Sequence, residues 1–339
     1  MFKLRILGML TALVVYLGTL GISYANTTLN GAGASFPYPV YSAWAFKYHK
    51  VTGTKLNYQS IGSGGGVRQI VNRTVDFGAS DAPLQSHELR KNKLLQFPAV
   101  IGGVVLVVNI PGIQSGELKL DGDSVCDIFM GEIQYWNDGK IKKLNPELKL
   151  PDKKITVVHR SDGSGTTAIF TDYLSGVCAR WKEKVGTGKA VKWPVGIGGK
   201  GNEGVANYVK RVKYSIGYVE FAYAEQNKLS HTLLQNLAGT FVEPSFESFK
   251  AAADSGDFDP SEDFHLWLNN APGPHAWPIA GATFILLAEE KAGSNKDVVQ
   301  FFDWAFKKGD ETAQKLIYIP LPQSLKEKIR DYWKTHGIY

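Results

Sequence analysis

The stretch Ile155-Thr156-Val157-Val158-His159-Arg160-Ser161-Asp162-Gly163-Ser164-Gly165-Thr166-Thr167 predicts a strand, a tight polar loop and the start of a helix. The apolar run 155–158 is typical of a strand, and the run 168–174 that follows is typical of a helix. Two glycines, several hydroxyls and backbone N–H groups lie in the loop beside the guanidinium of Arg160. Because N–H groups at a helix N-terminus bind oxyanions well, this loop is a candidate anion site.

The rest of the chain alternates short apolar runs with amphipathic stretches, which predicts an α/β architecture. We expect strands at 56–59, 76–79, 103–110, 155–158, 216–219 and 283–287, and helices at 38–50, 67–72, 167–175, 202–212 and 298–308. A length of 339 residues favours two domains. On open α/β sheets, ligands bind beyond the carboxyl ends of the strands, where loops lead into helices.

Three upstream segments repeat the polar, glycine-rich chemistry of this loop at other strand-to-helix positions. They are Gly31–Pro37, Gly62–Gly66 and Gly78–Pro83. Ser35 suits either a helix N-cap or a ligand contact, and the glycines after Ser63 permit either a flexible turn or a close backbone approach. Asp81 suits either an exposed turn or a buried position, where it must pair with a cation or share a proton with a ligand.

The loop that follows residue 158 offers both charged and neutral donors. Arg160 can make forked hydrogen bonds to an oxyanion, and Asp162 can hold the arginine in place. Ser164, Gly165 and Thr166 offer N–H groups at a helix start, and two of them add hydroxyls. Since most of these donors are neutral, helix N-termini can hold an anion here with few cations.

The first 25 residues have the pattern of a secretory signal peptide. Lys3 and Arg5 give a basic start, the uncharged and mostly apolar run 6–22 follows, and Ser23-Tyr24-Ala25 predicts cleavage after Ala25. The alternative is a membrane anchor that stays attached, although the apolar run is close to the lower length limit for a spanning helix. We therefore expect an exported protein.

Charge and cysteine content narrow the function classes. A formal net charge of +6, without a basic run or an aromatic-basic stripe, does not favour nucleic-acid binding. Cys126 and Cys178 lack the histidine spacing of a metal site. In an exported chain they either pair or remain two buried free thiols, and both readings stay open.

Enzyme motifs match the sequence poorly. Gly199-Lys200 lacks the spacing of a P-loop, and the nucleophile-elbow pattern fails at Ser63 and Ser164. Ser80 comes closer to that pattern, and His159 is near Ser164 in sequence. An exported esterase or phosphatase that uses Ser164 or Ser80 is therefore the alternative from the enzyme class.

A set of longer motifs extends over nearly the whole chain after residue 25. They are Gly31–Pro37, Val75–Pro83, Phe97–Val105, Asp162–Thr166, Gly198–Asn202, Ile216–Glu220 and Phe301–Ala305. Together they resemble the periplasmic phosphate-binding proteins of ABC-type phosphate uptake systems. The resemblance implies a two-lobe periplasmic-binding-protein fold with a hinge and a ligand cleft between the lobes. It places residues 26–103 and 277–339 in the first lobe and residues 104–276 in the second.

The same resemblance implies the ligands of a bound phosphate. They are Ser35, Phe36 (through its N–H), Ser63 and Asp81 from the first lobe, and Arg160, Ser164, Gly165 and Thr166 from the second. Asp162 matches the residue that steadies the arginine. The resemblance further implies a periplasmic monomer without enzyme activity, cofactor or metal. Its partners would be inorganic phosphate and a membrane-embedded ABC phosphate permease.

An ionised Asp81 would separate phosphate from related anions. Phosphate near neutral pH carries a proton that the carboxylate can accept, whereas sulfate would turn a bare oxygen toward the carboxylate. A site that requires a partner hydrogen can reject the analogue that lacks it by roughly 10⁴–10⁵. A binding protein for sulfate or molybdate is thus the alternative that Asp81 disfavours.

Overall fold

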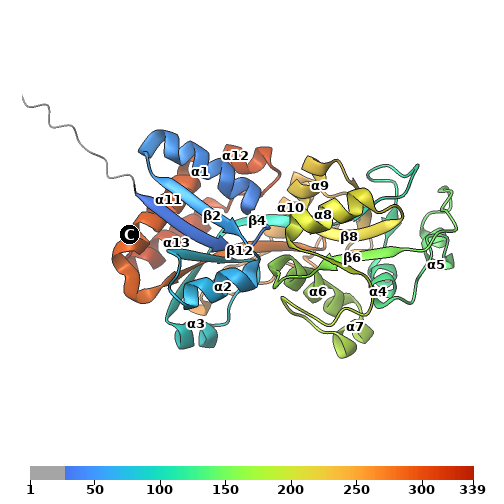
Figure 1. The fold of residues 1–339 in the computed structure, drawn as a ribbon, viewed down its shortest axis with the longest axis horizontal. Helices are drawn as coiled ribbons and strands as arrows, with labels where there is room; N and C mark the ends of the chain where they lie inside the picture. Colours follow the sequence, from blue (N-terminus) through green and yellow to red (C-terminus); the bar gives the residue numbers. More distant parts are fainter. Residues whose placement is uncertain (1–26) are drawn as a thin grey trace, which may run out of the picture.

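Two α/β lobes lie side by side along the long axis of the molecule (Figure 1). The computed structural model describes residues 27–339, so the predicted signal peptide, residues 1–25, lies outside the described part. The strands follow the order β2-β1-β3-β12-β4-β8-β6-β7 in one hydrogen-bonded path, with β9 also paired to β4. The α/β architecture predicted from the alternating pattern is confirmed. Among residues 27–339, every helix is too short or too polar for a membrane crossing.

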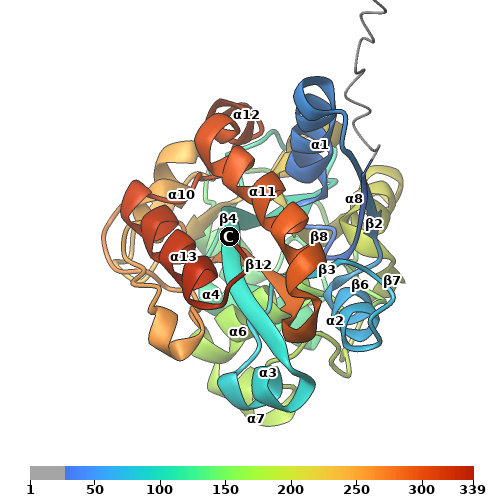
Figure 2. The same ribbon diagram turned by 90° about the vertical axis from the view of Figure 1, so that its left-hand side faces the viewer.

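The first lobe is built from the beginning and the end of the described chain (Figure 2). Its strands are β1 (Thr28–Gly33), β2 (Lys55–Ser60), β3 (Phe77–Ser80), β12 (Ala280–Ala288) and the first part of β4 (Leu94–Val108). Its helices are α1 (Tyr38–Thr52), α2 (Ser63–Val71), α3 (Ser86–Asn92), η2 (Glu289–Lys291), α11 (Ala292–Lys308), α12 (Asp310–Lys315) and α13 (Gln323–Thr335). Trp44, Phe302 and Trp333 bring α1, α11 and α13 into the larger core. Ile70 and Leu89 of α2 and α3 join a separate smaller cluster.

The second lobe continues the same strand path and adds a small sheet. Its strands are the rest of β4, β6 (Thr156–Arg160), β7 (Ile197–Gly199), β8 (Ser215–Glu220) and β9 (Ser230–His231), and the small sheet joins β5 (Lys119–Leu120), β10 (Leu233–Gln235) and β11 (Phe241–Val242). Its helices are α4 (Gly122–Met130), α5 (Gly139–Leu144), α6 (Gly165–Val177), α7 (Ala179–Lys184), α8 (Gly201–Arg211), α9 (Phe221–Asn227) and α10 (Phe246–Ala253). The short helix η1 (Pro260–Glu262) follows in the chain but packs against α13 of the first lobe, where Phe264 contacts Tyr332.

Strand β4 runs through both lobes. Its residues 94–103 pair with β12, and its residues 104–108 pair with β8, so the partner strand changes between Gly103 and Val104. All 15 residues of β4 are buried. The predicted strand at 103–110 is therefore wrong at its beginning, because Gln96, Pro98 and two glycines interrupt the apolar run that extends the strand back to Leu94.

The glycine-rich segment after Gly62 was expected to be a loop that leads to a helix at residue 67, and this expectation is wrong. Helix α2 begins at Ser63, so the glycines form its first turn. Glycine is a poor helix former, but packing requires it here: a Cβ on Gly66 would lie 2.5 Å from Gly33 Cα and 2.6 Å from the Ala32 carbonyl oxygen. Close contact with β1 therefore outweighs local propensity.

Smaller shifts move the predicted borders of other elements. Helix α11 begins at residue 292 rather than 298, and α6 begins at 165 rather than 167. Strand β6 covers 156–160, which places Arg160 at the end of the strand instead of in the loop. The last shift matters for function because strand pairing now fixes the backbone of the arginine.

Cys126 and Cys178 form a disulfide, which answers the question that the sequence left open. The bond joins α4 to the junction of α6 and α7 and closes a separation of 52 residues in the chain. Cys126 is completely buried and Cys178 is 4% exposed. The bond therefore holds two helices of the second lobe together from inside its core.

Removing this bond should destabilise the protein. In the chain-entropy model, a closed loop of this size is worth about 4 kcal/mol of unfolding free energy. We expect the double variant Cys126→Ala, Cys178→Ala to lose about 3–4 kcal/mol in urea unfolding followed by circular dichroism. An unfolding midpoint equal to that of the oxidised protein would contradict the assignment.

Candidate functional site

The residues that the sequence singled out meet where the two lobes contact each other, as the hydrogen bonds from Gly165 to Ser63 and from Asn202 to Ser35 show. Ser35 follows β1, Ser63 opens α2, Asp81 follows β3 and Arg160 ends β6. The group Ser35, Phe36, Ser63, Asp81, Arg160, Ser164 and Thr166, here called the cleft cluster, is at most 3% exposed at every member. These side chains come from strand ends and helix starts of both lobes, as the topology of α/β sheets favours.

Arg160 and Asp162 form a forked ion pair at the end of β6. Nε and Nη2 of Arg160 donate to the two carboxylate oxygens at 2.8 and 2.6 Å. Burial alone would raise the pKa of Asp162, but the hydrogen bonds and charge of Arg160 hold it below its usual value. The Gly201 N–H also donates to Asp162 at 3.1 Å. The carboxylate thus fixes the plane of the guanidinium, the role predicted for Asp162.

Asp81 is buried, so the exposed-turn reading of this residue is wrong. It is 2% exposed, and the Thr283 hydroxyl donates to its Oδ1 at 2.7 Å. Burial raises the pKa of Asp81 to about 7, although the Thr283 hydrogen bond and the charge of Arg160 act in the opposite direction. The carboxyl group can therefore gain or lose a proton near neutral pH.

Ser63 connects the lobes directly. Its hydroxyl oxygen accepts from the Gly165 N–H at 3.0 Å and from the Asp81 N–H at 3.2 Å. Next to it, the Gly64 N–H donates to the Gly163 carbonyl at 2.8 Å. The lobes approach this closely because residue 165 lacks a side chain: a Cβ there would lie 2.4 Å from Ser63 Oγ and 2.6 Å from Asp81.

The remaining predicted ligands take different positions. Ser35 and Thr166 both contact Asn202, at 2.8 and 3.1 Å from its Nδ2. Ser164 caps α6, because its hydroxyl accepts from the Thr167 N–H at 2.9 Å. The carbonyl of Phe36 accepts from the Tyr318 hydroxyl at 2.7 Å, while the ligand role of its N–H remains a prediction. All of these contacts lie inside the contact region of the lobes.

Sequence analysis missed several residues of this region. Thr283, Tyr318 and Tyr223 touch the cleft cluster from distant parts of the chain, with Tyr223 donating to the Ser35 carbonyl at 2.6 Å. Glu220 joins them through its contact with the Tyr318 hydroxyl. Asn202 and Glu220 are the last residues of two of the long motifs. The motifs therefore pointed to these two residues, but they did not indicate what role either residue has.

A family model described as a PBP superfamily domain matches residues 23–308. The chain is 55% identical over 325 residues to a phosphate-binding protein PstS of Pasteurella multocida (strain Pm70), covering 95% of this chain and 94% of the relative. It is 54% identical over 324 residues to a phosphate-binding protein PstS of Haemophilus influenzae (strain ATCC 51907 / DSM 11121 / KW20 / Rd), covering 95% and 97%. The chain belongs to the family of phosphate-binding proteins.

Solved structures agree with this family assignment at the level of the fold. A high affinity periplasmic phosphate-binding protein, solved with bound phosphate, matches with a TM-score of 0.70 at 21% identity, covering 90% of this chain and 93% of that chain. At that identity the similarity shows the two-lobe fold alone, and the fold expected from the resemblance is confirmed.

Members of the phosphate-binding protein family are binding proteins rather than enzymes, and the serine alternatives find no base at the site. The Ser80 hydroxyl donates to the Ala82 carbonyl at 2.7 Å, and Ser164 serves as the helix cap. His159 stacks on Trp193 with ring centroids 4.8 Å apart, and its Nδ1 faces the Arg160 carbonyl at 3.0 Å. Neither serine hydroxyl is thus engaged by the histidine, and the esterase or phosphatase alternative is not supported.

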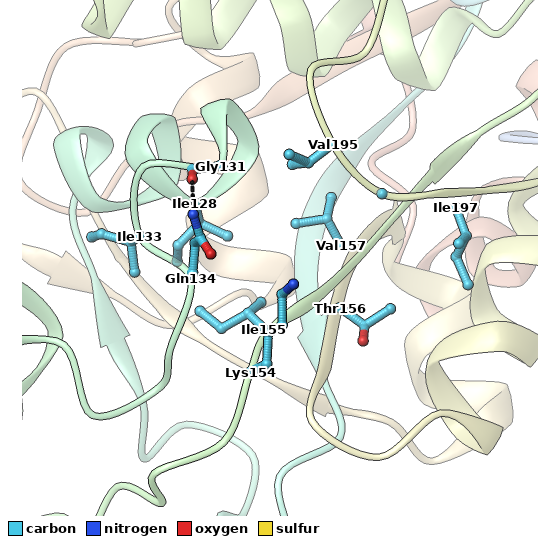
Figure 3. Close-up of a pocket in the computed structure, with 11 residues that line it drawn as sticks. Ile128, Gly131, Ile133, Gln134, Lys154, Ile155, Thr156, Val157, Val195 and Ile197 are labelled. Carbon is cyan, nitrogen blue, oxygen red and sulfur yellow. Dashed lines mark hydrogen bonds between the residues drawn. The ribbon is translucent and has the colours of Figure 1, made fainter.

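A separate pocket opens on the second lobe, at the end of β6 opposite to Arg160 (Figure 3). Its lining is mostly aliphatic, with Lys154 as the cation and Gln134 donating to the Gly131 carbonyl at 3.2 Å. Such a lining offers an anion little beyond one exposed charge. In this member of the phosphate-binding protein family, the cleft cluster is therefore the better candidate for an anion.

The buried carboxyl group of Glu220 shares the Tyr318 hydroxyl with the carbonyl of Phe36. The Tyr318 hydroxyl lies 2.7 Å from the Phe36 carbonyl and 2.8 Å from Glu220 Oε2, and its single proton cannot serve both acceptors. If Tyr318 donates to Phe36, the short contact with Glu220 requires a protonated carboxyl group. Burial raises the pKa of Glu220 well above its usual value, in agreement with this proton count.

This proton should appear in the pH dependence of stability. A raised pKa in the folded state means that folding takes up a proton above the unfolded pKa, so Glu220 destabilises the fold increasingly as pH rises. Glu220→Gln removes this penalty, and its amide can donate in place of the carboxyl group. We expect its melting temperature relative to the unaltered protein to rise between pH 5 and pH 8. Glu147→Gln, at an exposed position, is the control; equal pH profiles for all three proteins would contradict a protonated Glu220.

Proposed function

We propose that this protein binds inorganic phosphate in the cleft between its lobes and delivers it to an ABC-type phosphate permease. The observation that carries the proposal is a buried carboxyl group, Asp81, which accepts from Thr283 of the first lobe and lies beside Arg160 and Gly165 of the second. No bond is broken in this function. Capture requires only that the site replaces the hydration shell of the anion with fixed donors.

The donors fit a tetrahedral oxyanion. Helix α6 directs its N-terminus into the cleft cluster through Gly165 and Thr166, and α2 does the same from Ser63. Each helix terminus contributes roughly 0.3–1 kcal/mol, and up to about 2 kcal/mol when partly buried. Arg160 adds a full charge whose plane Asp162 fixes. We assign the ligand roles to Ser35, the Phe36 N–H, Ser63, Asp81, Arg160, Ser164, Gly165 and Thr166, with Asp162 in support.

Selectivity rests on Asp81. Phosphate at neutral pH retains at least one proton, which an ionised Asp81 accepts, whereas sulfate turns only bare oxygens toward the carboxylate. The neighbouring donors attract both anions alike. An unpaired acceptor facing another acceptor in a buried site is costly, so the carboxylate excludes the fully deprotonated anion.

We further propose that the lobes move about two crossing segments. One is β4, where the pairing partner changes between Gly103 and Val104. The other is the segment at Trp277, whose indole N–H donates to the Val104 carbonyl at 2.9 Å. This pattern supports a division into 26–103 with 277–339 and 104–276. The closed contacts of Ser63 and Gly64 with the second lobe would then form when phosphate binds.

The proposed location is the periplasm, with a signal peptide cleaved after Ala25. The basic start, apolar run and small residues of 1–25 support export, and the disulfide suits an oxidising compartment. The partners proposed are inorganic phosphate and the membrane-embedded permease, which a monomeric binding protein would visit in its closed form.

Calorimetry with phosphate and sulfate tests the proposal. We expect strong phosphate binding and little or no heat from sulfate at pH 8. Asp81→Asn should reduce the ratio of the two affinities by at least about 100-fold, because the amide can donate to either anion. Asp152→Asn makes the same change at an exposed position and should leave the ratio unaltered. Sulfate binding as tight as phosphate binding would contradict the proposal.

The same experiment has a pH arm. Since the pKa of Asp81 in the closed arrangement is about 7, its protonated fraction grows as pH falls below neutrality. A protonated carboxyl group can donate to sulfate, so discrimination by the unaltered protein should weaken from pH 8 to pH 5.5. The Asp81→Asn variant should show no such weakening.

A further inference from the structure

Asn202 uses both hydrogens of its side-chain amide inside the contact region of the lobes. It lies in the first turn of α8 and is completely buried. Its Nδ2 donates to Ser35 Oγ at 2.8 Å and to Thr166 Oγ1 at 3.1 Å, and its backbone N–H donates to Ser35 Oγ at 3.1 Å. One side chain therefore contacts a predicted ligand hydroxyl from each lobe.

The contact of the Asn202 side-chain oxygen with Glu220 fixes the orientation of the amide group. Its Oδ1 accepts from the Glu220 N–H at 3.0 Å. A backbone N–H can only donate, so the amide atom that faces it must be the oxygen. The NH₂ group must then face Ser35 and Thr166.

The contacts with Asn202 restrict what the Ser35 hydroxyl can do. A hydroxyl has one proton to donate and two lone pairs that accept. Both lone pairs of Ser35 Oγ are occupied, one by the backbone N–H and one by the Nδ2 of Asn202. The proton is what remains for a ligand, so Ser35 can donate to an anion but cannot accept from it.

The same count applies to the hydroxyl of Thr166. Its Oγ1 accepts from Asn202 Nδ2 at 3.1 Å and from Arg160 Nη1 at 3.3 Å. Both hydroxyls are therefore held as donors, one on each side of the cleft.

We propose that Asn202 is a positioning residue that sets the hydrogen-bond polarity of Ser35 and Thr166, and that this polarity decides how phosphate is oriented. The inference rests on the proposed function. A protonated phosphate oxygen cannot be accommodated against two hydroxyls that only donate. The proton of the ligand is thereby directed to Asp81, and bare oxygens are directed to Ser35 and Thr166.

The test uses two substitutions. Asn202→Asp keeps the shape, but a carboxylate accepts from both hydroxyls and turns their lone pairs toward the anion. We expect phosphate affinity at pH 8 to fall by at least about 100-fold, since two donor contacts reverse. Asn202→Ala leaves both hydroxyls free to rotate, and we expect a loss of about tenfold. Asn57→Asp adds the same charge at an exposed site of the first lobe and should bind like the unaltered protein.

A pH profile separates polarity from a merely structural role. At pH 5 the new carboxyl group of Asn202→Asp regains a proton and can donate again. In Asn202→Ala the freed hydroxyls can accept the second proton that phosphate then carries. Both losses, relative to the unaltered protein at the same pH, should therefore shrink by at least about fivefold between pH 8 and pH 5. A structural defect would give a loss that does not depend on pH.

Other charged groups around Asn202 also respond to pH, and the comparison at equal pH accounts for them. They are Arg160 of β6, Asp162 of the following loop, Asp81 after β3, Glu220 of β8 and Glu203 of α8. Melting temperatures identify a variant that does not fold, and Asn202→Ala decides the matter if Asn202→Asp fails.

Unchanged affinity in the folded variants, or losses of equal size at both pH values, would overturn the inference. Absence of phosphate binding by the unaltered protein would instead overturn the proposed function.

Discussion

A carboxyl group buried between two lobes is the constraint on which the rest of the structure depends. Asp81 is 2% exposed, and burial raises its pKa to about 7. A charge in that position is costly unless a partner supplies a proton or a donor. Thr283 supplies one donor from β12, and Arg160 lowers the cost from the other lobe. A ligand that carries a proton can donate it in a further hydrogen bond to the carboxylate. Phosphate carries such a proton near neutral pH, and sulfate does not.

The backbone is shaped to let the two lobes reach this carboxyl group. Residues 64, 163 and 165 are glycines at the points of closest approach, and a Cβ on Gly165 would collide with Ser63 and Asp81. β1 and β3 of the first lobe and β6 of the second run in opposite directions, so their carboxyl ends face each other and bring polar side chains to the same place. Asn202 then crosses the boundary and orients one hydroxyl from each lobe.

Local sequence patterns predicted much of this region, and their failures have physical causes. The polar segments at 31–37, 62–66, 78–83 and 160–167 are recognisable in the sequence because turn chemistry and helix caps are local. Thr283 is not, since it meets Asp81 across 202 residues of chain, and the Ser35–Asn202 contact spans 167. The early start of α2 was hidden because close packing of Gly66 on β1 outweighs helix propensity.

The central claim is that one anion touches Asp81 and Arg160 together, and a crystal structure of the mature protein grown with phosphate tests it most directly. The account predicts phosphate with one oxygen in a short hydrogen bond to the Asp81 carboxylate and others contacted by Arg160 and the α6 N-terminus, in a closed arrangement of the lobes. Phosphate bound to one lobe only, or bound away from Asp81, would contradict the account.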